Sequence, residues 1–162
     1  MIPHTPSRIV LTHEGGVECC DEDPRNRIRG NQNVHQNTVG WPDIAFHYIV
    51  TPDGDIYEGR NDGYQSSSSY ARINPGYDLD GTIVIGLLGN YDRQIPRRVM
   101  IQATEDLMAW LCQEYGISSN QIYYLRDVAP DDVSGGATTS PGSNMPESQQ
   151  FRNAVADILD HR

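Results

Sequence analysis

Cationic residues are scarce in this sequence, which has 12 Lys and Arg against 22 Asp and Glu and a formal net charge of -10. No basic stretch is dense enough to neutralise a run of phosphates, so nucleic acid is not an expected partner. Apolar runs are too interrupted for a membrane span, with 37% hydrophobic residues in all. Nine Tyr and two Trp nevertheless make the chain too aromatic for disorder. A globular protein is expected.

Cysteines are also few, and their spacing gives no sign of a disulfide framework. Cys19 and Cys20 are adjacent, and Cys112 lies in a stretch with helical periodicity. Secreted domains held together by disulfides usually have an even number of spaced cysteines, so free thiols are expected here. The start, Met1–Val10, lacks a basic segment followed by an apolar one, which is how a secretion signal begins. The chain as written is expected in the cytoplasm, unless it is released or exported by another route.

The 162 residues have the length of one domain, and no repeat or linker divides them, so residues 1–162 are expected to form a single domain. Residues 8–12 form a short β-branched run that ends at His13, as expected of a buried strand. Residues 44–50 and 55–58 flank an Asp-Gly turn and predict a hairpin. The continuous apolar run 82–88 predicts a central strand buried on both faces.

Helical spacing follows in the second half of the chain. Apolar residues recur every three or four positions between Pro96 and Gly116, and again from about 148 to 160. A short strand at 121–126 and a short helix near 32–36 are weaker expectations. Together these elements predict an α/β domain with a central mixed sheet flanked by helices.

Several motifs occur in an order that points to one family. They are the strand that ends at His13, the stretches 40–48 (Gly-Trp-Pro-Asp-Ile-Ala-Phe-His-Tyr), 57–60 (Tyr-Glu-Gly-Arg) and 83–91, then 125–130 and 138–142. This order resembles the type 2 N-acetylmuramoyl-L-alanine amidases, which include the peptidoglycan recognition proteins and phage lysozyme amidases. The resemblance implies a groove for the stem peptide of peptidoglycan, and in active members a zinc held by two His and a Cys or Asp.

At the positions of the family's catalytic groups, this chain departs from the pattern. His13 matches the first zinc histidine, but Leu125 stands at the second and Ser140 at the Cys or Asp. Phe46 replaces the assisting tyrosine, and only Thr138 remains of the auxiliary groups. Aliphatic side chains cannot bind zinc, and a neutral hydroxyl is a poor ligand. We therefore expect no metal, no cofactor and no catalytic residues, and a protein that binds muropeptides rather than cutting them.

Two other functions stay open at this point. Asp131 or Asp132 could complete a rearranged zinc site with His13, or His13 could act as acid and base with Glu14 or a loop aspartate in an altered hydrolase. Alternatively, the domain could be a scaffold in a phage or secretion assembly.

Ligand contacts are expected along the groove, from peptidoglycan fragments or stem peptides. The candidate ligand-binding residues are His13, Phe46, Arg60, Tyr64, Tyr70, Asn74, Arg126 and Thr138. Arg60 is suited to bidentate capture of a carboxylate, but a structural ion pair beneath the groove explains it equally well. His47 is expected in the core and His4, His35 and His161 at the surface. The sequence does not predict the stem-peptide type or the oligomeric state.

Overall fold

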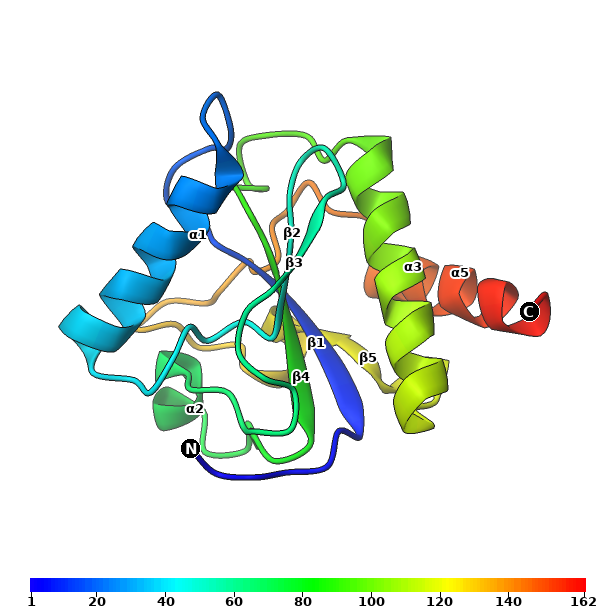
Figure 1. Ribbon diagram of the computed structural model, residues 1–162, viewed down its shortest axis with the longest axis horizontal. Helices are drawn as coiled ribbons and strands as arrows, with labels where there is room; N and C mark the ends of the chain where they lie inside the picture. Colours follow the sequence, from blue (N-terminus) through cyan, green and yellow to red (C-terminus); the bar gives the residue numbers. More distant parts are fainter.

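A five-stranded mixed sheet forms the centre of the computed structural model, which describes all residues from Met1 to Arg162 (Figure 1). Its strands are β1 (Arg8–His13), β2 (Tyr48–Val50), β3 (Ile56–Glu58), β4 (Thr82–Leu87) and β5 (Ile122–Tyr124). In space their order is β3-β2-β4-β1-β5. Only the β2–β3 pair is antiparallel, and the three other pairs are parallel. The predicted hairpin is therefore confirmed, although its first strand begins four residues later than expected.

Helices cover both faces of the sheet, as predicted. They are α1 (Pro24–Asn33), η1 (Val34–Val39), α2 (Ser69–Ile73), α3 (Arg98–Tyr115), η2 (Ser119–Gln121), α4 (Leu125–Val128) and α5 (Ser148–Asp160). Helices α3 and α5 lie on one side of the sheet in Figure 1, and α1 and α2 lie on the other. None of the helices combines the length and the apolar composition that crossing a bilayer requires.

Side-chain alternation along β1 divides the sheet into a core face and a second face. Ile9 and Leu11 join a cluster of 20 buried residues that also contains Met108 of α3 and Phe151 of α5. Val10 points the other way and packs in a smaller cluster with Leu125. Successive residues of a strand point to opposite faces, so Thr12 lies on the same face as Val10. This second face carries the candidate site.

The adjacent cysteines differ from expectation. Cys19 and Cys20 are joined by a disulfide, so the prediction of free thiols is wrong for this pair, while the buried Cys112 is free. The spacing argument concerned cross-links between distant segments, and it gives no signal for a bond between neighbours. Gln94 holds this segment: the Cys19 amide donates to its Oε1 at 2.9 Å, and its Nε2 donates to the Cys19 carbonyl at 2.6 Å.

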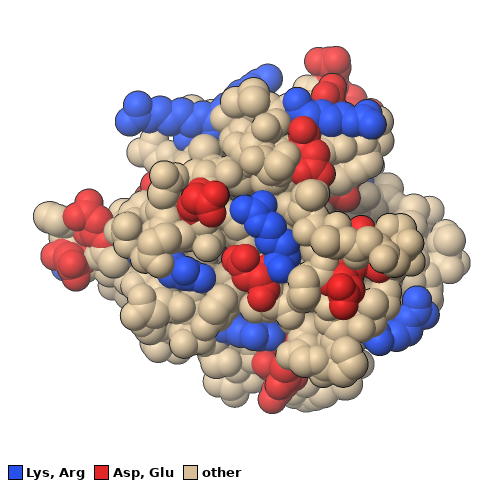
Figure 2. Space-filling model, turned by 180° about the vertical axis from the view of Figure 1, so that it is seen from behind, with Lys and Arg blue, Asp and Glu red and all other residues tan.

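Charged side chains are mixed rather than segregated on the surface. Figure 2, which shows the face turned away from the viewer in Figure 1, has basic side chains separated by acidic and uncharged ones. No broad basic area appears on this face, which agrees with the excess of acidic residues in the sequence. A phosphate backbone would find no continuous cationic track there.

Candidate functional site

A pocket of about 190 Å³ opens on the second face of the sheet, beside the carboxyl end of β1. Its walls come from the end of β1, from η1 and the segment that follows it, and from the serine-rich stretch that leads into α2. The loop after α2 and single residues from the sheet and α4 complete them. The lining residues are Thr12, His13, Glu14, His35, Trp41, Ala45, Phe46, Ser66–Ser69, Tyr70, Tyr77, Val84 and Leu125. The walls thus combine aromatic and aliphatic side chains with hydroxyl groups.

Thr12 forms the polar part of the pocket floor. Its Oγ1 lies 2.7 Å from the Oγ of Ser140, and the two residues are only 7% and 2% exposed. The backbone N–H of His13 also donates to the Ser140 hydroxyl, at 3.2 Å. Ser140 therefore lies directly behind Thr12 and is held by two neighbouring residues of β1.

Phe46 and Leu125 flank Thr12 on its two sides. Thr12 is paired with Gly86 of β4, and a Cβ at Gly86 would lie only 2.6–2.8 Å from the ring of Phe46. The ring thus packs directly on the backbone of β4, which requires glycine at that position. On the other side, Leu11 is paired with Tyr124, so the next residue, Leu125, stands beside Thr12. A hydroxyl between an aromatic and an aliphatic side chain is the result.

His13 lines the pocket but does not point its ring nitrogen to Ser140. Its Nδ1 accepts a hydrogen bond from the amide of Tyr91 at 3.1 Å. Burial lowers the pKa of His13, and the negative charges of Asp92 and Glu14 oppose this shift. The side chain that meets Ser140 is Thr12, whereas the ring of His13, one residue further along β1, is bonded to Tyr91.

The predicted convergence of distant motifs is largely observed. His13, Phe46 and Leu125 line one pocket, and Ser140 contacts Thr12 at its floor. Thr138 does not line the pocket but contacts Ser140 behind it: its Oγ1 accepts from the amide of Ser140 at 3.2 Å. Segments that are more than one hundred residues apart in the chain therefore meet at the end of β1.

The side chains at this point do not fit a zinc ion. Zinc sites in proteins use thiolate, imidazole or carboxylate ligands, whereas Thr12, Ser140 and Leu125 supply two neutral hydroxyls and an alkyl group. Nowhere in the structure do three or more His, Cys, Asp and Glu side chains gather in a way that would hold a metal. Asp131 and Asp132 are absent from the pocket lining, and the Asp132 carboxylate instead accepts from the amide of Ser134 in its own turn.

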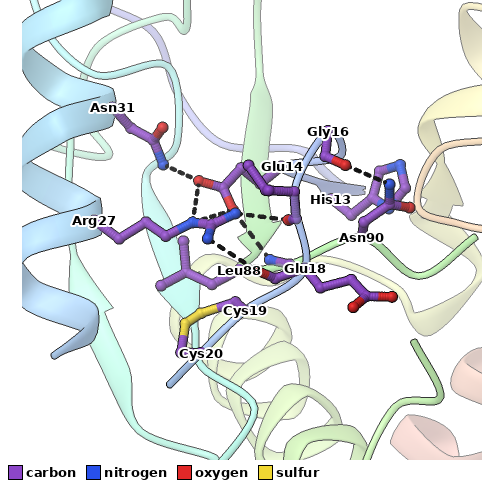
Figure 3. Close-up of polar contacts among 12 residues, drawn as sticks. His13, Glu14, Gly16, Glu18, Cys19, Cys20, Arg27, Asn31, Leu88 and Asn90 are labelled. Atoms are coloured by element: carbon purple, nitrogen blue, oxygen red, sulfur yellow. Dashed lines mark hydrogen bonds and ion pairs between the residues drawn. A yellow bond between two sulfur atoms is a disulfide. The ribbon is translucent and has the colours of Figure 1, made fainter. Parts of the chain in front are cut away.

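A partly buried ion pair fixes the rim of the pocket. The Glu14 carboxylate accepts from Arg27 Nε at 2.7 and 2.8 Å, from Asn31 at 2.8 Å and from the Gly89 amide at 3.1 Å. Figure 3 shows Arg27 and Asn31 reaching from α1 toward this carboxylate. The side chains of Glu14 and Arg27 are 12% and 11% exposed, so the two charges compensate each other away from bulk water. This pair joins α1 to the end of β1, and no sequence pattern predicted it.

His35 lines the pocket, so the prediction that it lies at the surface is wrong. Its Nδ1 accepts from the Ala45 amide at 3.1 Å, and its ring centroid lies 4.9 Å from that of Trp41 and 5.9 Å from that of Phe46. Burial is the main cause that lowers the pKa of His35, followed by the charge of Arg60. His35 of η1 and the aromatic residues of the segment after η1 therefore form one connected wall.

Arg60 is buried and therefore not available to a ligand, so the prediction that it contacts a ligand in the groove is wrong. It is 2% exposed, and its guanidinium donates to three backbone carbonyls: Ile44 at 2.9 Å, Gln65 at 2.7 Å and Asp43 at 2.7 Å. No carboxylate pairs with it in a salt bridge, so the alternative of a structural ion pair is also wrong. Arg60 instead fastens the segment before β2 to the loop after β3.

Four other predicted ligand contacts also lie outside the pocket lining, namely Thr138 and the three residues described next, whereas Tyr70 is part of it. Tyr64 forms a bridge with Pro3, and its carbonyl pairs with His47 at 2.8 Å. The buried Asn74 donates to the carbonyls of Tyr70 and Asp131. Arg126 donates to the carbonyls of Thr139 and Gly142, each at 3.2 Å. The side chains of Asn74 and Arg126 thus join loops to one another, a role that sequence alone does not distinguish from ligand binding.

His47 is completely buried, as predicted, and acts as part of the backbone network. Its Nδ1 accepts from the Val84 amide at 2.9 Å, and its Nε2 pairs with the Tyr64 carbonyl at 2.8 Å. The ring is therefore neutral, with the proton on Nε2. Burial lowers its pKa to about 4.

Acidification should destabilise the protein through His47. Between pH 6.5 and 4 the unfolded chain takes up a proton on this residue that the folded protein does not, so stability falls as the pH falls. A shift from 6.5 to about 4 corresponds to roughly 3 kcal/mol. Urea unfolding at pH 7 and pH 4.5 should show a smaller loss of stability for His47→Asn than for the wild-type protein. Equal losses in both would contradict this role of His47.

Comparison with protein families gives one match that spans most of the chain. The family model for N-acetylmuramoyl-L-alanine amidase matches residues 3–143. Peptidoglycan-recognition protein SC1a of Drosophila melanogaster is 30% identical over 141 residues, which is 86% of this chain and 69% of that protein. Peptidoglycan-recognition protein 1 of Holotrichia diomphalia is 31% identical over 102 residues, or 62% of this chain. The matched part spans only about half of the Holotrichia protein, 49% of its length.

Solved structures share the fold at lower identity. The amidase LysC of Clostridium intestinale superposes with a TM-score of 0.70 at 22% identity, over 96% of this chain and 86% of that one. Drosophila peptidoglycan recognition protein SD gives a TM-score of 0.72 at 24% identity, over 90% and 81%. A complex of the recognition proteins LCa and LCx bound to tracheal cytotoxin gives 0.71 at 24% identity, over 90% and 82%. The central mixed sheet flanked by helices is thus a fold that amidases and recognition proteins share.

Proposed function

The chain belongs to the N-acetylmuramoyl-L-alanine amidase family, and from this we propose that it binds peptidoglycan-derived muropeptides in the pocket at Thr12 without hydrolysing them. The similar proteins of Drosophila and Holotrichia are named for peptidoglycan recognition. The LCa and LCx complex holds tracheal cytotoxin, a peptidoglycan fragment. These likenesses support the ligand class.

The pocket has the mixed character that a muropeptide needs. Sugars and short peptides present apolar faces beside amide and hydroxyl groups, and they bind sites that combine aromatic side chains with a few polar groups. Here Trp41, Phe46 and Tyr70 supply aromatic surface, and the serines at 66–69 supply hydroxyls. The pocket also lies where the family motifs of the chain meet.

The observation that supports binding without hydrolysis is the contact between the hydroxyls of Thr12 and Ser140 beside Leu125. Amide hydrolysis in this family depends on a zinc ion that polarises the carbonyl and activates water. Two neutral hydroxyls and an alkyl group do not hold such an ion. The ring of Phe46 also lacks the hydroxyl of the tyrosine that assists the reaction in active members.

An amidase with a rearranged site remains the second candidate, and a scaffold role the third. The first would need imidazole or carboxylate ligands in addition to His13, and Glu14 is already engaged with Arg27, Asn31 and Gly89. A scaffold would have no use for an open pocket with polar and aromatic walls, so the binding function is favoured over it.

Incubation with insoluble peptidoglycan tests both parts of the proposal. The protein should sediment with the polymer equally well with and without a chelator, because no metal takes part in binding. Chromatography of the supernatant should show no released stem peptides, while a zinc amidase run in parallel releases them. Release of stem peptides by this protein would establish the amidase alternative. Failure to sediment, together with failure to bind soluble muropeptides, would leave the scaffold role.

A further inference from the structure

The hydroxyl groups at the pocket floor leave one hydrogen-bond donor for a ligand. Ser140 Oγ already accepts from the His13 amide at 3.2 Å and lies 2.7 Å from Thr12 Oγ1. If Thr12 donated to Ser140, the hydrogen of the Ser140 hydroxyl would be buried without an acceptor, which is unfavourable. Ser140 therefore donates to Thr12, and the hydrogen of the Thr12 hydroxyl remains.

That remaining hydrogen has only a weak partner within the protein. The acceptor in reach is the His13 carbonyl, at 3.4 Å. Hydrogen bonds between oxygens are usually 2.7–2.8 Å long, so this contact is long and easily exchanged for a better one. Thr12 lines the pocket, and the hydroxyl can turn its hydrogen into it.

The surroundings of this donor determine what can bind there. Phe46, Val84 and Leu125 line the same pocket and are apolar. Glu14 is the one acidic residue of the lining, and Arg27 compensates its charge. The pocket has no arginine among its lining residues, and burial lowers the pKa values of His13 and His35, which favours their neutral forms. An ionic group would lose its hydration here without gaining a partner of opposite charge.

We infer that the Thr12 hydroxyl donates to the carbonyl oxygen of an uncharged, methyl-bearing amide of the ligand, whose methyl group packs against Leu125 and Phe46. The inference rests on the proposed function and adds a specific contact to it. A muropeptide such as N-acetylmuramoyl-L-alanyl-D-isoglutamine has three such amides: the N-acetyl group of the sugar, the amide between the lactyl group and alanine, and the amide between alanine and isoglutamine. Each has a methyl group on its carbonyl carbon or on the next carbon.

Thr12→Val tests the contact, because valine has the shape of threonine without the hydroxyl. Calorimetric titration with N-acetylmuramoyl-L-alanyl-D-isoglutamine should give a Kd about fivefold to tenfold higher for this variant than for the wild-type protein, the effect of one hydrogen bond. Thr12→Ser keeps the donor and should bind within about twofold of the wild type. Thermal unfolding of each variant checks that the fold persists.

The outcomes separate the contact from the function as a whole. A wild-type protein that binds the muropeptide, together with an unchanged Kd for Thr12→Val, would overturn the contact and leave the proposed function standing. Equal weakening in Thr12→Ser and Thr12→Val would also overturn it, because packing and not the hydroxyl would then matter. A wild-type protein without affinity for any muropeptide would overturn the function itself.

A second ligand shows whether the acetyl amide or a peptide amide is bound. The same muropeptide without its N-acetyl group retains the lactyl–alanine and alanine–isoglutamine amides. If Thr12 contacts the acetyl group, the difference between the wild type and Thr12→Val should disappear with this ligand. If Thr12 contacts one of the two peptide amides, the difference should persist.

Discussion

Replacing Thr12 and Leu125 with histidine and Ser140 with cysteine should create a zinc site at the pocket floor. Thr12 and Ser140 are in direct contact, with 2.7 Å between their hydroxyl oxygens, and Leu125 lines the same pocket. Two imidazoles and a thiolate at these positions would match the ligand set of catalytic zinc sites. We expect one zinc per protein with a Kd below about 1 μM, equivalent to more than about 8 kcal/mol. Calorimetry and elemental analysis would measure both quantities.

The double variant Leu125→His with Ser140→Cys is the matched control. It keeps His13 as the only histidine of β1, and the Nδ1 of this ring is engaged with the amide of Tyr91. Zinc binding should therefore be at least about a hundredfold weaker than in the triple variant, since a ligand is missing. Equal affinity in the two variants would show that His13, as the sequence suggested, is the ligand at this site. An absence of zinc binding in both, with the fold intact, would show that the three positions do not converge closely enough.

Arg60→Ala should cause a large loss of stability. The guanidinium is 2% exposed and bonds to the carbonyls of Asp43, Ile44 and Gln65. Removing it leaves three carbonyls without their donor, each worth about 1 kcal/mol or more, and a cavity in addition. The expected decrease in the free energy of unfolding is about 3–5 kcal/mol.

Arg126→Ala is the control for this variant, because Arg126 also donates to two carbonyls but is only partly buried. Its loss should cost no more than about 1 kcal/mol. Urea unfolding of the two variants would give the comparison. A small effect of Arg60→Ala on stability, combined with loss of muropeptide binding, would instead restore Arg60 as a ligand contact.

The sequence predicted the frame of the fold because its signals are local. The continuous apolar run of β4 and the spacing of apolar residues in α3 and α5 follow from which faces are buried. The family motifs also predicted which distant segments meet, and these segments do meet at the pocket beside the end of β1. Even the orientation of Thr12 was accessible, because alternation from the buried Val10 places both residues on one face.

The contacts of individual polar side chains could not be predicted in this way. Arg60 and Asn74 are polar residues of the kind that bind ligands, but in the fold their side chains donate to backbone carbonyls of other segments, such as those of Asp43 and Asp131. His35 looked like a surface residue because its partners, Trp41 and Phe46, become neighbours only when the segment after η1 folds back. Such contacts depend on the tertiary structure and have no periodic signal in the sequence.

The most direct test of metal-free muropeptide binding is a titration of chelator-treated protein with N-acetylmuramoyl-L-alanyl-D-isoglutamine, followed by calorimetry. Binding through Thr12 and the aromatic wall predicts saturable heat with one ligand per protein, and the same Kd when zinc is added. Binding that appears only after zinc is added, or a ligand recovered cleaved between the lactyl group and alanine, would contradict it.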